Sequence, residues 1–226
     1  MAKPWSFDAH AKRYRSGQTG RFIGKKVVVQ LRDDVVSAAA KDARQLAERA
    51  ARGEVTAEEL RAGLRLAVRN AQAAEYIFGR GGVNAMTNAD FGRLGSTLRT
   101  AYARLEPLIL DATTGRASEA QAANRAQMAV DGGVKAFEQG QASTWGVAGQ
   151  LPLYPGDNCL GMTNCRCSWS ISEGDYTIDA TWTLGGADPC GPCQQNAARY
   201  TPYSIIKPYA NPEAGPVRLT MVRRAA

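Results

Sequence analysis

The residues best able to do chemistry in this 226-residue chain are its five cysteines, which all lie within 35 positions of the C-terminal third. They are a single Cys159, a Cys-x-Cys pair at Cys165 and Cys167, and a Cys-x-x-Cys pair at Cys190 and Cys193. A segment of this size buries too little apolar surface to close a core without crosslinks or a metal. Thiols at these spacings bind metals, form disulfides or carry out thiol–disulfide exchange.

The segment between the two cysteine pairs predicts a β-hairpin. Apolar and polar side chains alternate from Tyr176 to Leu184, and Trp169 and Ile171 begin a similar alternation before a turn at 173–175. An antiparallel hairpin places the start of its first strand beside the end of its second. We therefore expect the two cysteine pairs to meet at one end of the hairpin.

Four converging thiolates are what a tetrahedral zinc ion requires, so we predict a structural Zn²⁺ in this region. The candidate ligands are Cys159, Cys165, Cys167, Cys190 and Cys193. Cys190 and Cys193 come first, followed by the Cys-x-Cys pair. Cys159 either replaces one of these four or is a spare thiol.

Disulfides or free thiols are the competing interpretation of the cluster. The first six residues contain no apolar segment of a signal peptide, and no stretch approaches the roughly 18 apolar residues of a membrane span. We therefore expect a reducing cytosol, where clustered cysteines bind metal more often than they form bridges. Cys190-Gly191-Pro192-Cys193 also matches the redox centre of thioredoxins, but only 33 residues follow it, too few to complete that fold.

The middle of the chain predicts four helices of about 20 residues each, because apolar residues recur there at helical spacing. Three of them begin with capping sequences, at Thr56, Thr87 and Ser118. Gly53 stands where a C-terminal cap of the first helix belongs, and Pro107 should kink or stop the third. The expected helices cover 31–50, 56–78, 87–105 and 118–137.

Three glycines, Gly92, Gly95 and Gly133, lie inside these helical stretches. Small residues let helix backbones approach closely. Packing within the chain is the favoured reason for them, and a partner helix docking there is the alternative.

Positive charge is concentrated at both ends of the chain. The formal net charge is +7, of which residues 1–26 carry +6 and the last eleven residues +3, leaving −2 for the body. The first segment also interleaves four aromatic residues with its cations, namely Trp5, Phe7, Tyr14 and Phe22. This mixture is more typical of an arm that orders on an acidic or nucleic-acid partner than of a solubilising tail.

Together these patterns predict an α+β protein with a mainly helical N-terminal two-thirds. Four parts are expected: a basic aromatic arm (1–26), a helical domain (27–145), a cysteine-rich zinc-binding β-hairpin module (146–200) and a Pro-rich extended arm (201–226). We expect the last arm to end in a short strand, Val217–Val222.

Catalytic chemistry has little support in the sequence. The single histidine, His10, lies in the basic arm, so a Ser-His-Asp or Cys-His constellation lacks a base. The segment 20–26 matches a phosphate loop only in part, because the Ser or Thr after the lysine is missing and no strand leads into it. We therefore expect a protein that is not an enzyme.

Motifs spread over most of the chain carry a family resemblance. The most specific is Asn164-Cys165-Arg166-Cys167, preceded by Pro155-Gly156-Asp157 and combined with the Cys-x-x-Cys pair. Weaker motifs lie at 19–22, 81–82, 86–92, around Leu105 and at 115–119. Together they resemble the minor head proteins of tailed phages, and loosely the head morphogenesis proteins of the phage Mu type.

The cysteine motifs depart from the Mu-type pattern in one respect. In that family the Cys-x-x-Cys precedes a His-x-x-Cys-Arg-Cys box, whereas here the order is reversed. Met162 stands at the position of the histidine and cannot replace it as a zinc ligand. Cys159 is the candidate replacement.

The resemblance implies a structural protein of the phage virion, a minor head protein near the portal or the inner capsid surface that acts in head assembly or in DNA packaging and delivery. It implies other virion proteins (portal, capsid or neck) as partners, a homo-oligomer, and a location in the virion and in the host cytoplasm during assembly. The basic arms predict non-specific DNA contact, and no membrane association is expected. A zinc-containing nucleic-acid-binding protein and, with less support, a thiol–disulfide oxidoreductase are the alternatives.

Overall fold

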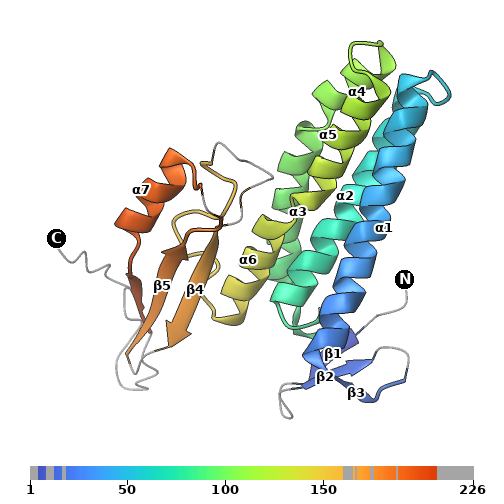
Figure 1. Ribbon diagram of the computed structural model, residues 1–226. Coiled ribbons are helices and arrows are strands. Elements are labelled where there is room, and N and C mark those ends of the chain that lie inside the picture. Colours follow the sequence, from blue (N-terminus) through green and yellow to red (C-terminus); the bar gives the residue numbers. More distant parts are fainter. Residues whose placement is uncertain are drawn as a thin grey trace.

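The computed structural model describes residues 5–8, 13–16, 19–159, 165, 167–173, 176–186 and 188–207. The fold is α+β and mostly helical, as predicted. An elongated helical domain lies beside a smaller cysteine-rich module, and a small sheet lies at the end where the first helix begins (Figure 1).

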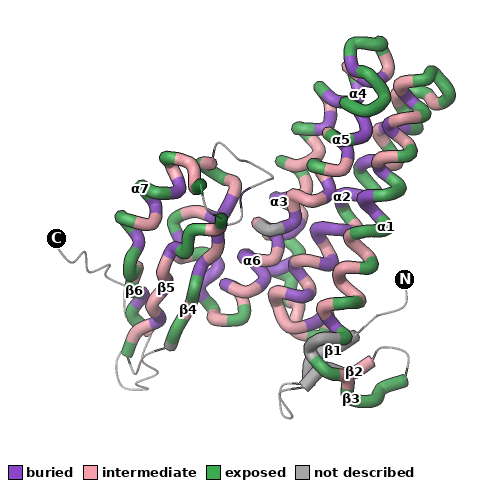
Figure 2. Tube along the Cα trace, in the orientation of Figure 1, coloured by how far each residue is buried: buried purple, intermediate pink, exposed green. Residues whose placement is uncertain are grey.

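Six α-helices make up the helical domain. They are α1 (Lys25–Ala51), α2 (Ala57–Gly79), α3 (Asn88–Ala103), α4 (Glu106–Thr113), α5 (Glu119–Asp131) and α6 (Val134–Thr144), with a short 3-10 helix, η1 (Val83–Ala85), before α3. α1 packs against α2 and α5, and α2 also packs against α6. Buried side chains of α1, α2, α4 and α5 share the main core (Figure 2).

The helix caps form where the sequence predicts them. Thr56, Thr87 and Ser118 each make a capping box with the residue three positions later. Gly53 adopts a positive φ of 76° after α1, and its N–H bonds to the Ala50 carbonyl oxygen. Capping residues in the local sequence therefore set the starts of α2, α3 and α5 and the end of α1.

Six helices replace the four expected, because α4 is an additional helix after the third and the fourth predicted helix is broken into α5 and α6. Pro107 lies in the first turn of α4, where a backbone N–H has no helical hydrogen bond to make, so its missing N–H costs nothing. α3 therefore ends before Pro107, and α4 starts there. Gly132 and Gly133 separate α5 from α6. Gly133 packs closely on α2, since a Cβ there would lie 2.7 Å from Cγ of Glu75.

The backbones of α2 and α6 touch where the two helices cross. A Cβ on Gly79 would lie 2.2 Å from the carbonyl oxygen of Phe137, and one on Gly140 would lie 2.2 Å from that of Tyr76. These positions therefore accept only glycine. Thr144 bridges the crossing, because its hydroxyl lies 3.2 Å from both the Gly79 and the Gly140 carbonyl oxygens.

The glycines of α3 behave differently. A Cβ on Gly92 or Gly95 would meet nothing within 4 Å. Packing within the chain, expected for these two positions, is wrong for both.

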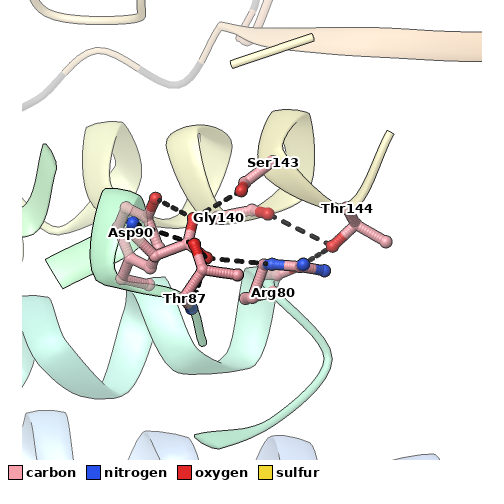
Figure 3. A network of polar contacts seen from close by, with 8 residues as sticks. Arg80, Thr87, Asp90, Gly140, Ser143 and Thr144 are labelled. Atoms are coloured by element: carbon pink, nitrogen blue, oxygen red, sulfur yellow. Dashed lines mark hydrogen bonds and ion pairs between the residues drawn. The ribbon is translucent and has the colours of Figure 1, made fainter. Parts of the chain in front are cut away.

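A buried carboxylate, Asp90, joins α2, α3 and α6 beside this crossing (Figure 3). It accepts hydrogen bonds from the Tyr76 hydroxyl at 2.9 Å, from the Thr87 N–H at 2.8 Å and hydroxyl at 2.7 Å, and from Ser143. Arg80 pairs with it at 3.3 Å. Burial opposes ionisation of Asp90, but the hydrogen bonds from Ser143, Thr87 and Tyr76 outweigh it and hold the pKa of Asp90 below its usual range.

The described part of the expected N-terminal arm forms an antiparallel sheet. Its strands are β1 (Trp5–Asp8), β2 (Arg13–Ser16) and β3 (Phe22–Ile23), in the order β1-β2-β3. β1 lies beside η1, and the Arg15 guanidinium stacks 3.9 Å from the centre of the Phe22 ring. The described part of this segment is therefore a sheet resting on the helical domain, and its docking on a partner stays a prediction. His10 lies outside the described residues.

The predicted hairpin is present in the cysteine-rich module, and it gains a third strand. β4 (Ser168–Glu173) pairs with β5 (Thr177–Thr183), which pairs with β6 (Tyr203–Ile206), while α7 (Gly191–Arg199) lies between β5 and β6 in sequence. The module therefore extends past its expected end at residue 200, into the segment predicted as an extended arm. The strand expected at 217–222 lies outside the described residues.

Within the described part of the chain, no helix combines the length and the apolar character needed to cross a lipid bilayer.

Candidate metal centre

The hairpin register brings the Cys-x-Cys pair to the end of the hairpin opposite its turn, called here its open end. Cys167 immediately precedes β4, and Trp169 on β4 lies opposite Trp182 on β5. The two indoles make an edge-to-face contact with ring centroids 5.0 Å apart. Cys165 and Cys167 are 5% and 2% exposed, so this end of the sheet is inside the module's core.

Helix α7 supplies the Cys-x-x-Cys pair. Cys190 is the residue before the first helical turn and Cys193 lies in that turn, because Pro192 favours the start of a helix. The end of α7 is tied to β5 by a hydrogen bond from the Trp182 N–H to the Tyr200 carbonyl oxygen at 3.0 Å. This places Cys193 against the open end of the hairpin, as the sequence predicts.

A tight turn at residues 154–157 precedes Cys159 and positions it. Gly156 adopts a φ of 87° after Pro155, and the Asp157 N–H bonds to the Tyr154 carbonyl oxygen at 3.0 Å. The Asp157 carboxylate accepts the Tyr154 N–H at 3.0 Å and pairs with Lys135 on α6. The Pro-Gly-Asp motif thus anchors the loop before Cys159 to the helical domain.

The structure brings all five cysteines into one cluster, and none of them forms a disulfide. The Sγ atoms of Cys159, Cys165 and Cys193 all lie within 4.8 Å of one another. Cys159 lies 3.5 Å from Cys193 and 3.4 Å from Cys190, and Cys165 lies 3.9 Å from Cys193 (Sγ to Sγ). Cys167 and Cys190 both adjoin Cys193.

These separations match a tetrahedral thiolate site. Zn–S bonds of about 2.3 Å in a tetrahedron place the sulfurs about 3.8 Å apart. The separations of 3.4, 3.5 and 3.9 Å lie close to that value. A set of sulfur donors alone also selects soft or borderline metals over magnesium and calcium. The cluster can therefore hold a metal ion.

Burial governs the ionisation of the cluster. It raises the pKa of Cys165 to about 11, although the N–H of Cys167 donates to its sulfur and opposes the rise. Burial also raises the pKa of Cys193, and neighbouring thiols add to the effect. Without a metal these thiols are protonated at neutral pH, so a metal ion would bind with release of their protons.

The roles predicted for individual cysteines shift in one respect. Cys159, expected as a replacement ligand or a spare thiol, belongs to the tightest group together with Cys165 and Cys193. The other two cysteines lie beside this group: Cys190 contacts Cys159, and Cys167 contacts Cys193. Met162 lies outside the described residues.

Sequence reasoning missed a buried acid that joins the module to the helical domain. Glu138 on α6 is 3% exposed and accepts the Trp169 N–H at 2.9 Å. Burial raises its pKa to about 7, against the effect of that hydrogen bond. Nothing in the pattern around position 138 distinguishes it from a solvent-exposed helical glutamate.

The fold and the cluster define an α+β protein whose smaller module is organised around a thiol site able to bind a metal. Comparisons of the chain with protein-family models, with curated proteins and with solved structures found no match.

Proposed function

We propose that this protein is a structural, non-enzymatic component of a tailed-phage virion: a minor head protein near the portal or inner capsid surface, acting in head assembly or DNA packaging and delivery. The observation that supports this most directly is the convergence of the two cysteine motifs that carry the family resemblance. Cys165 of the Asn-Cys-Arg-Cys box and Cys193 of the Cys-x-x-Cys pair lie 3.9 Å apart (Sγ to Sγ).

We further propose that the metal is a structural Zn²⁺. Cys159, Cys165 and Cys193 would hold it, with Cys190 or Cys167 as the fourth ligand. The described part of the module has one three-stranded sheet and one short helix to close its core, so a metal crosslink would stabilise it substantially.

A structural role is favoured over thiol redox catalysis by the number of sulfurs gathered in the cluster. Thiol–disulfide exchange at Cys-Gly-Pro-Cys needs only two sulfurs. Here Cys159 lies 3.4 Å from Cys190, and Cys165 lies 3.9 Å from Cys193 (Sγ to Sγ).

The metal proposal is tested on the full chain purified under reducing conditions. Native mass spectrometry should find one zinc per chain, and chelation should shift the fluorescence of Trp169 and Trp182, which pack beside the cluster. Cys193→Ser should abolish zinc binding, whereas one of the variants Cys167→Ser and Cys190→Ser should retain it. A metal-free chain whose module keeps its native fluorescence would refute the proposal.

The virion role is tested by co-expressing the protein with the products of genes adjacent to its own and analysing the assembled particles by mass spectrometry. Incorporation in a few copies per particle supports the role. Free protein that binds DNA with a steep salt dependence and no particle association would favour the nucleic-acid-binding alternative. Turnover of a disulfide substrate would favour the oxidoreductase.

A further inference from the structure

An apolar groove of about 1050 Å³ runs between α1, α2 and α3, on the helical domain. Its floor contains buried small and apolar residues, including Ala39, Ala67 and Leu94. Two large side chains that line it are exposed, Leu66 at 47% and Phe91 at 55%. An apolar concavity with exposed large side chains is typical of a protein-binding surface.

One glycine of α3, Gly95, lies at the same surface. Glycine in a helix interior is less favourable than alanine, because its backbone loses more conformational freedom. At Gly92 and Gly95 no contact in the described chain compensates this cost, because a Cβ would meet nothing within 4 Å. Gly95 lines the groove, so its missing side chain leaves the α3 backbone open to close approach from outside.

Charged side chains of both signs lie along the groove. Three charged side chains line it: Asp42 and Arg49 from α1, and Arg69 from α2. Arg49 pairs with Glu54 at 3.5 Å. Asp42 and Arg69 form no ion pair with any residue in the described part of the chain. One surface therefore offers one unpaired anion and one unpaired cation.

We propose that this groove is the interface between two copies of the chain related by a two-fold axis. In such a contact the same surface meets itself, so every pairing occurs twice. Asp42 of one copy then pairs with the partner's Arg69, and Arg69 with the partner's Asp42. Leu66 and Phe91 enter the partner's groove. The inference goes beyond the virion role, because it concerns self-association of the isolated chain.

The test is a charge-reversal cycle on the full chain, with the dimer Kd measured by sedimentation velocity. Asp42→Arg or Arg69→Asp alone replaces two attractive pairs by two repulsive ones, and each should raise Kd about tenfold or more. The double variant restores opposite charges and should return Kd to within about threefold of the unmodified chain. Arg99→Asp is the control, because Arg99 is exposed on the same helical domain and does not line the groove.

Leu66→Lys provides an independent apolar test, since this exposed residue can change without a cavity in the core. It should weaken the dimer while the helical circular dichroism stays unchanged. A chain that is monomeric throughout the micromolar range, single reversals that behave like Arg99→Asp, or a double variant that does not recover would each overturn the proposal. Binding of a different protein to the groove of a monomeric chain would overturn it as well. The virion test is independent, because it reads particle incorporation.

Discussion

Replacing Gly140 by alanine probes the α2–α6 crossing directly. The new Cβ would lie 2.2 Å from the Tyr76 carbonyl oxygen and 2.9 Å from the Arg80 nitrogen, whereas an ordinary contact is at least 3.4 Å. Both neighbours are backbone atoms, so the helices must separate by about 1 Å. Overpacking of this kind costs about 1–3 kcal/mol. Alanine recovers about 1 kcal/mol of helix propensity.

The separation also weakens contacts on either side of Gly140. Thr144 donates to one of the carbonyl oxygens on the two touching helices, and Ser143 donates to Asp90 (Figure 3). We therefore expect Gly140→Ala to lower the free energy of unfolding by about 1–2 kcal/mol net. Urea unfolding followed by far-UV circular dichroism measures this change.

Gly92→Ala is the matched control, because Gly92 lies inside α3 and its Cβ would meet nothing within 4 Å. This variant gains helix propensity without a clash and should be stabilised by about 0.5–1 kcal/mol. The two substitutions are chemically identical, so the gap of about 1.5–3 kcal/mol between them isolates the backbone contact. Equal stability of Gly140→Ala and Gly92→Ala would refute the close backbone contact between α2 and α6.

Two buried acids should give opposite pH dependences. Because the pKa of folded Asp90 is held below its usual range, its contribution is present above about pH 4 and is lost at lower pH. Asp90→Asn should cost about 2–3 kcal/mol at pH 7, and the difference from the unmodified chain should shrink below pH 4 in acid titrations of urea unfolding. Burial raises the pKa of Glu138 to about 7, so its effect is destabilising and grows from about pH 4.5 to 7. Glu138→Gln keeps an acceptor for the Trp169 N–H and should be the more stable protein at pH 8; equal stability there would contradict the assignment.

The parts of the fold that the sequence predicts well are those set by local signals. The capping boxes at Thr56, Thr87 and Ser118 need only residues within one helical turn, and all three form. The hairpin follows from a period of two over residues 176–184, and β4 and β5 pair antiparallel.

The parts that were missed depend on contacts between distant segments. A glycine pair at 132–133 is compatible with a continuous helix until α6 must turn to pack on α2. The four residues of β6 are too few to show a clear strand pattern in the sequence. They form a strand because they pair with β5. Cys159 stands apart from both cysteine pairs in sequence, and only the turn at 154–157 brings its thiol to Cys193.

Two contacts from α6 connect the cysteine cluster to the helical domain. Glu138 accepts the N–H of Trp169, two residues after Cys167, and Lys135 pairs with Asp157, two residues before Cys159. Metal binding would therefore order two segments that are each fixed to the same helix, and α6 itself crosses α2 with no space between the backbones. We therefore expect a bound metal to reinforce the attachment of the module to α6 that these two contacts make. A fixed orientation between two surfaces is what the proposed assembly role requires, so these two contacts from α6 support that proposal.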